Sequence, residues 1–201
     1  VSRNPRSVVK LLGVGRLIET KGFIHLLHAC GELRNRGHAF VCEIVGGPSD
    51  PVDTVTWLML RRAYESLRLQ DIVIFSGAVG YSSVVEAYRR VDIFVLPCVR
   101  ARDGAHDVTP NSLMEAMAMG LPAVTTATGA IPEIMTDGAE GIFVEPGNSL
   151  ALADAIEKLM LDPQLRADLG SRARQKIATS FDAQTNYAIM ASLFERAART
   201  Q

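Results

Sequence analysis

The sequence lacks the features that mark several classes of protein. Its 201 residues carry a net charge of −1 and no block of Lys and Arg, so electrostatics give no reason to expect a nucleic acid or a polybasic membrane contact. The longest apolar runs, such as residues 93–97, are far too short for a transmembrane helix. Cysteine is scarce: Cys30, Cys42 and Cys98 are an odd number without metal-ligand spacing. We therefore expect reduced, buried thiols in a cytoplasmic protein.

The sequence does contain a regular alternation of short apolar runs and longer amphipathic segments. We expect strands at residues 8–12, 40–45, 72–75, 92–96, 123–126 and 142–144. We expect helices at residues 22–36, 55–67, 83–90, from 110 onward, at 131–135, 149–161, 163–179 and 183–199. A Ser-x-x-Glu capping box, Ser83 to Glu86, would open the third of these helices. This order predicts one α/β domain, a Rossmann-like parallel sheet of about six strands with helices on both faces.

The stretch from Asp107 to Pro122, D-V-T-P-N-S-L-M-E-A-M-A-M-G-L-P, is the most informative. Thr109 is a suitable N-cap and Pro110 a suitable first helical residue, because the missing N–H of proline costs nothing there. The next N–H groups would have no partner within the helix, and with the positive end of the helix dipole they form an anion site. These N–H groups belong to Asn111, Ser112 and Leu113.

Two carboxylates flank this predicted anion site. Asp107 lies just before the cap and Glu115 about one turn into the helix, and each can accept hydrogen bonds from two neighbouring hydroxyls. A phosphate between two groups that bind hydroxyls describes a nucleotide-sugar. Three alternatives stay open: Glu115 as a surface acid, Asp107 as a residue that favours the helix dipole, and the pair as the two acids of a hydrolase.

The loop at residues 15–22, G-R-L-I-E-T-K-G, places two cations after the first strand. Arg16 can form two hydrogen bonds with phosphate oxygens, and Lys21 supplies a point charge across the same turn. A dinucleotide-binding turn would have a third glycine where Ile18 stands, so NAD is disfavoured as a ligand. Taken alone, the two cations are more simply solvated surface residues, but a second anion site in the same fold favours phosphate binding.

Together these segments resemble the retaining glycosyltransferases of family 4, which have the two-Rossmann-domain architecture called GT-B. The loop G-R-L-x-x-x-K-G is similar to that family's diphosphate loop, and Asp107 with Glu115 to its E-x7-E motif, with Asp in the first place. The resemblance covers nearly the whole chain in the expected order, with further matches at I-F-S-G-A-V (74–79), D-I-F-V-L-P (92–97), E-A-M-A-M-G-L-P (115–122) and G-A-I-P-E-I (129–134). It implies the C-terminal half of a GT-B enzyme.

The resemblance implies a role for each candidate residue. Arg16 and Lys21 would hold the donor diphosphate and stabilise its charge as it leaves, and Asp107 would bind hydroxyls of the transferred sugar, which makes these three the catalytic candidates. Glu115 would accept hydrogen bonds from the ribose. The remaining donor-binding candidates are Gly15 in the loop, Val79 against the base, and Asn111, Ser112 and Leu113 through their N–H groups.

The resemblance also implies an activity and partners. Residues 1–201 would be the donor-binding domain of an enzyme that transfers a hexose or related sugar from a UDP- or GDP-sugar to a glycan, lipid or small-molecule acceptor. No Asp-x-Asp metal site is evident, so we expect no metal and no cofactor. The N-terminal acceptor domain would be absent from this chain, which would leave the fragment inactive. That domain would also supply any peripheral contact with the inner face of the membrane.

Two further expectations concern the end of the chain and the function class. The last predicted helix, residues 183–199, would cross toward the absent domain, and its residues Tyr187, Met190 and Phe194 would form an apolar patch if uncovered. The alternatives to a glycosyltransferase are a non-catalytic nucleotide-binding module and a GT-B-like epimerase or phosphorylase. No role is assigned to His106 or Cys98.

Overall fold

A six-stranded parallel sheet forms the centre of the part of the chain that the structure describes. The structure is a computed structural model, and it describes residues 8–48, 51–106 and 109–198. Neighbouring strands pair in the order β3-β2-β1-β4-β5-β6, and every pair is parallel. The predicted fold class is confirmed, and the strand order reverses between β1 and β4. The strands are β1 (Val9–Val14), β2 (Phe40–Val45), β3 (Val73–Gly77), β4 (Ile93–Leu96), β5 (Ala123–Thr126) and β6 (Gly141–Val144).

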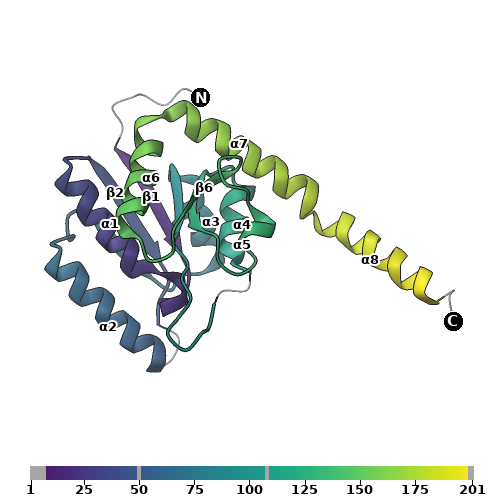
Figure 1. Cartoon of the computed structure of the whole chain (residues 1–201), viewed down its shortest axis with the longest axis horizontal. Helices are drawn as coiled ribbons and strands as arrows, with labels where there is room; N and C mark the ends of the chain where they lie inside the picture. The colour runs from purple at the N-terminus through teal and green to yellow at the C-terminus, as the bar shows by residue number, and fades with distance from the viewer. Residues whose placement is uncertain (1–7, 49–50, 107–108, 199–201) are drawn as a thin grey trace.

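Helices cover both faces of this sheet (Figure 1). One face carries α1 (Phe23–Asn35), with α2 (Pro51–Ser66) and α6 (Ser149–Leu161) packed against it. The other face carries α3 (Tyr81–Arg89), α4 (Asn111–Ala118), the short α5 (Ile131–Ile134) and the first part of α7 (Pro163–Ser180), which packs on α4. A 3-10 turn, η1 (Glu19–Lys21), precedes α1. The sheet is therefore enclosed, and β4, at its centre, is buried at every residue.

Side-chain caps determine where α6 and α7 begin. Asn148 Oδ1 accepts a hydrogen bond from the N–H of Ala151 at 2.9 Å, and Asp162 Oδ1 accepts one from the N–H of Leu165 at 2.9 Å. Pro163 follows Asp162 at the first helical position, where its missing N–H leaves no donor unpaired. Both helices therefore begin where the sequence predicts them.

The predicted capping box of α3 is wrong. The helix begins at Tyr81, and Gly80, in an extended conformation (φ −66°, ψ 156°), is its N-cap residue. The Gly80 carbonyl accepts the N–H of Ser83 at 3.0 Å, so Ser83 lies inside the first turn and not before it. Glu86 forms an ion pair with Arg89 instead of returning to a cap.

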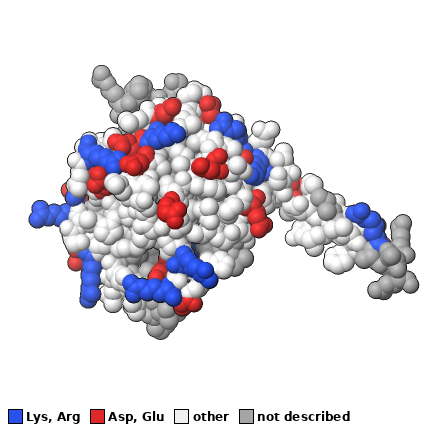
Figure 2. Space-filling model, in the orientation of Figure 1, with Lys and Arg blue, Asp and Glu red and all other residues white. Residues whose placement is uncertain are grey.

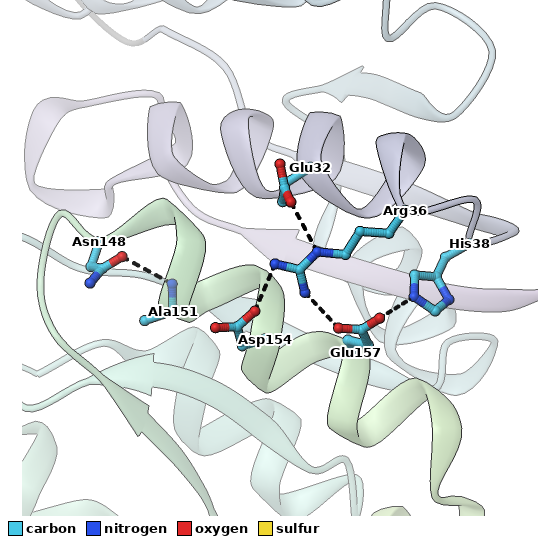
Figure 3. A network of polar contacts seen from close by, with 7 residues as sticks. All are labelled: Glu32, Arg36, His38, Asn148, Ala151, Asp154 and Glu157. Atoms are coloured by element: carbon cyan, nitrogen blue, oxygen red, sulfur yellow. Dashed lines mark hydrogen bonds and ion pairs between the residues drawn. The ribbon is translucent and has the colours of Figure 1, made fainter.

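A network of charged side chains joins α1 to α6 (Figure 3). Arg36, just after α1, lies between three carboxylates: Glu32 at 3.0 Å, Asp154 at 2.7 Å and Glu157 at 2.5 Å. His38 contacts the second oxygen of Glu157. Hydrogen bonds from His38 and Arg36 hold the pKa of Glu157 below its ordinary value. On the face shown in Figure 2, basic and acidic side chains are correspondingly intermixed over this part of the domain.

The last helix, α8 (Ala183–Ala198), extends away from the body of the domain (Figure 1). The side chains of Tyr187, Met190 and Phe194 are 70%, 49% and 70% exposed. In the space-filling view of Figure 2, this arm carries few charged side chains. The apolar patch expected on this helix is therefore uncovered in this chain.

The cysteines and the helices answer two of the expectations from composition. Cys30, Cys42 and Cys98 are buried and form no disulfide, which confirms the prediction of buried thiols. Among the described residues, none of the helices combines the length and the apolar character that crossing a bilayer would need.

Candidate functional site

A cavity of about 640 Å³ opens beside the carboxyl ends of β1 and β4, where the strand order reverses. Ligands of parallel α/β sheets bind at such a position. One side of the cavity is the first loop, which we define as residues 15–22. The other side is the second segment, residues 97–106 and 109–112. The residues that line the cavity are Gly15, Arg16, Ile18, Thr20, Lys21, Ala105, His106, Thr109, Asn111 and Ser112.

Close backbone contacts hold the start of the first loop. The N–H of Gly15 donates to the carbonyl of Val45 at 3.0 Å. Gly46, with φ +145°, lies directly against Gly15, and a Cβ at position 46 would come within 1.8 Å of the Gly15 oxygen. Only glycine allows this approach, since any side chain would overlap the loop backbone. The peptide that leads into Arg16 is therefore fixed by β2.

The two cations lie on the same side of the cavity. The aliphatic part of Lys21 passes over Gly15, because a Cβ at position 15 would lie 3.2 Å from Lys21 Cε. Arg16 is exposed and makes no ion pair with any residue that the structure describes. Both side chains line the cavity, as expected, and both can bring positive charge to an anion there.

The first loop and the second segment are joined to each other. Gly22, with φ +65°, packs on the carbonyl of Pro97, and a Cβ at position 22 would lie 1.9 Å from that oxygen. The N–H of Val99 donates to the carbonyl of Thr20 at 3.0 Å. These contacts connect the turn after β1 to the chain that leaves β4, so they set the distance between the two sides of the cavity.

The helix on the second side begins one residue later than predicted. Pro110, with φ −76° and ψ 98°, is the N-cap residue of α4, and Thr109 is not. The Pro110 carbonyl accepts the N–H of Leu113 at 3.0 Å, so the prediction of a free N–H at Leu113 is wrong. The N–H groups of Asn111 and Ser112 meet no acceptor within the described part of the chain, and both residues line the cavity. Two donors, not three, remain for an anion.

Other candidates lie apart from the cavity lining. Glu115 is half-buried one turn into α4 and accepts a hydrogen bond from Tyr88 at 2.9 Å. Val79 is 39% exposed in the turn between β3 and α3. Leu113 is buried in the core. Asp107 lies outside the described residues, whereas its neighbour His106, to which no role was assigned, lines the cavity.

Two contributors to this site were missed by sequence reasoning. Gly46 directly follows the strand expected at residues 40–45, and its φ of +145° against Gly15 depends on a contact between separate segments. Tyr88 lies on the buried side of α3, so helical periodicity could have identified it as a core residue. No local sequence pattern indicates that its hydroxyl would pair with Glu115.

Comparison with known proteins identifies the family. Residues 3–176 match the model of the glycosyl transferases group 1 family. The amylovoran biosynthesis glycosyltransferase AmsK of Erwinia amylovora is 31% identical over 191 residues, which are 94% of this chain and 45% of that protein. The chain spans less than half the length of this and other curated relatives that it matches.

Solved structures share the fold. The Anabaena protein HepE, in complex with UDP and glucose, has a TM-score of 0.83 at 21% identity, over 95% of this chain and 49% of its own. The C-terminal domain of the group 1 glycosyltransferase LpcC of Francisella tularensis has a TM-score of 0.73 at 24% identity, over 88% and 89%. The chain therefore belongs to the glycosyl transferases group 1 family, and it has the fold of a C-terminal GT-B domain.

Proposed function

We propose that this chain binds the nucleotide-sugar donor of a retaining glycosyltransferase, with the diphosphate in the cavity between the first loop and α4. The observation that carries the proposal is the convergence of Arg16 and Lys21 with the free N–H groups of Asn111 and Ser112 around one cavity. The two groups of donors come from opposite sides and from distant parts of the chain. A diphosphate has oxygens enough to engage both sides at once.

The same donors suit the leaving group of the reaction. As the sugar departs, negative charge grows on the diphosphate, and fixed cations and N–H groups stabilise that charge without rearranging. Arg16 would act as a fork on two oxygens, and Lys21 as a point charge beside it. The contacts of Gly46 and Gly22 hold the backbone of the first loop, so both cations extend from a backbone that is in place before the nucleotide-sugar binds.

The remaining roles extend along α4. Glu115, one turn beyond the free N–H groups, would accept hydrogen bonds from the ribose, and Val79 would lie against the base. Asp107 would bind hydroxyls of the transferred sugar. The acceptor, a glycan, lipid or small molecule, would be held by an N-terminal domain that packs on the exposed side chains of α8. The three buried cysteines form no disulfide, which supports a cytoplasmic location.

Calorimetric titration of this chain with UDP, GDP and ADP tests the proposal, with and without EDTA. We expect one of the three to bind equally well in EDTA. Arg16→Ala should weaken it tenfold or more, because a hydrogen bond to a charged group contributes roughly 1.5–3 kcal/mol. Glu115→Gln should weaken it by a similar factor. Arg62→Ala, which removes an exposed cation from α2 outside the cavity, is the matched control and should bind normally.

Three results would contradict this function. Failure of all three nucleotides to bind would contradict the presence of a donor site. Equal losses of affinity in Arg16→Ala and Arg62→Ala would mean that the nucleotide is held by general electrostatic attraction and not by a specific contact with Arg16. Sugar transfer by residues 1–201 alone would contradict the requirement for a separate acceptor domain.

A further inference from the structure

A buried tyrosine connects α3 to α4, the helix whose first residues line the cavity. Tyr88, on α3, is only 2% exposed, and its hydroxyl donates to Glu115 Oε2 at 2.9 Å. The same hydroxyl lies 3.2 Å from the carbonyl oxygen of Ser112, in the first turn of α4. The tyrosine therefore reaches both the carboxylate and the turn whose N–H groups face the cavity.

The hydroxyl has one proton, and the carboxylate is the stronger acceptor for it. Burial and the negative charge of Glu115 raise the pKa of Tyr88 above its ordinary value, because both disfavour the phenolate. The hydroxyl consequently stays protonated and donates across the physiological pH range. A charge-assisted hydrogen bond to Oε2 follows from this arrangement.

The ring of Tyr88 is itself held in place. It packs on Phe94 of β4, with ring centroids 5.9 Å apart and planes tilted by 55°. Glu115 is only half-buried, and a glutamate side chain of that exposure would otherwise exchange among several rotamers. A rigid donor on Oε2 selects one of them. The other oxygen, Oε1, has no hydrogen-bond partner in the described part of the chain, so it remains available to a ligand.

We propose that Tyr88 is a positioning residue for donor binding: it fixes the Glu115 carboxylate so that Oε1 meets the ribose hydroxyls of the nucleotide. This inference rests on the proposed function, since it requires that Glu115 binds the ribose. A residue on the buried face of α3 would thereby help the site to distinguish a ribonucleotide from a ligand without ribose hydroxyls. Tyr88 acts only through Glu115 and does not touch the ligand.

A comparison of two ligands separates positioning from a structural role. The ligands are the nucleoside diphosphate that binds the unmodified chain and its 2′,3′-dideoxy counterpart, each titrated into Tyr88→Phe, Glu115→Gln and the double variant. Tyr88→Phe keeps the ring and its contact with Phe94 and removes only the hydroxyl. We expect it to weaken the ribonucleotide by roughly three- to tenfold, and to change the dideoxy ligand by less than about twofold. In Glu115→Gln, the added Tyr88→Phe change should have little further effect.

The affinity ratio of the two ligands is measured on one sample, so partial unfolding of a variant lowers both affinities alike and leaves the ratio unchanged. Tyr64→Phe removes a hydroxyl from a half-buried tyrosine on α2 and should keep the ratio of the unmodified chain. Equal losses for both ligands, or no loss in Tyr88→Phe, would overturn the positioning role while the donor site stands. Failure of the unmodified chain to bind any nucleoside diphosphate would overturn the proposed function, and this inference with it.

Discussion

The two sides of the cavity are held by different kinds of contact. The first loop is fixed by backbone lying on backbone, with Gly46 against Gly15 and Gly22 against Pro97. The second segment shares the contacts of Pro97 with Gly22 and of Val99 with Thr20, and side chains hold it in addition. Thr126 Oγ1 donates to the carbonyl of Cys98 at 2.6 Å just after β4.

The two kinds of contact should respond differently to substitution. Where glycine allows two backbones to touch, no larger residue fits, so a substitution of the glycine would displace the loop. Where a hydroxyl holds a carbonyl or a carboxylate, the removal of one atom changes the geometry and leaves the packing intact. Substitutions on the first side should therefore damage stability and binding together. Those on the second side should change binding by smaller and more selective amounts.

The largest effect is expected from Gly46→Ala. The new Cβ would meet the Gly15 oxygen at 1.8 Å, and φ +145° is strained for any residue with a side chain. Strain and overlap together should cost about 3 kcal/mol or more of unfolding free energy, measured by urea denaturation. Nucleotide affinity should fall as well, because the displaced peptide leads into Arg16.

Gly37→Ala is the matched control for this prediction. Gly37 also has a positive φ, +83°, but a Cβ there would have no atom within 4 Å. It should lose only the left-handed cost of roughly 1–2 kcal/mol and keep normal nucleotide affinity. Similar losses of stability in both variants would show that conformational strain alone, and not contact with the first loop, determines the effect.

Intermediate effects are expected from two neighbouring buried threonines of β5. Thr126→Val removes the hydrogen bond to the Cys98 carbonyl, and Thr125→Val removes the one that Thr125 Oγ1 donates to the Leu96 carbonyl at 2.6 Å. Each should lower the unfolding free energy by about 0.5–1.5 kcal/mol, because one buried hydrogen bond is lost. Only Thr126→Val should also weaken nucleotide binding in calorimetry, since Cys98 belongs to the second segment and Leu96 does not. An equal loss of affinity in both variants would contradict the separate role of this segment.

The sequence predicts the features that depend on near neighbours along the chain. Each strand is an apolar run, so the sheet and the alternation of helices follow from periodicity. Arg16 and Lys21 come directly after such a strand, and parallel topology then brings their loop to the same edge as the start of α4. The meeting of these residues at one cavity could therefore be expected before any coordinates.

What the sequence does not reveal are contacts between separate segments. The pair Gly46 and Gly15 and the pair Tyr88 and Glu115 each join two elements, and neither residue of a pair carries a local mark of its partner. The start of α4 was missed for another reason. Proline satisfies the requirements both of a cap and of a first helical residue, and the ψ of 98° at Pro110 that decides between them is set by the surrounding fold.

The smallest effect is expected from the charged network between α1 and α6, which lies outside the cavity lining. The pKa of Glu157 is lowered in the folded chain, mainly by His38 and then by Arg36, so ionised Glu157 stabilises the fold above its unfolded pKa. This contribution is lost as the pH falls below about 4.5, through the lower folded pKa. Glu157→Gln should therefore reduce the thermal midpoint slightly at pH 7 and make the loss of stability between pH 5 and pH 3 less steep.

Glu157→Gln also tests whether nucleotide affinity depends on the geometry of the cavity or on the stability of the whole domain. Because Glu157 holds α6 on α1 and touches neither side of the cavity, Glu157→Gln should bind the nucleotide normally at pH 7. Glu65→Gln, which breaks an exposed pair with Arg61 on α2, is its control and should change neither quantity measurably. A loss of affinity in Glu157→Gln comparable to that in Thr126→Val would mean that the second segment responds to the stability of the entire fold. The two sides of the cavity would then differ only in how strongly a loss of stability lowers nucleotide affinity.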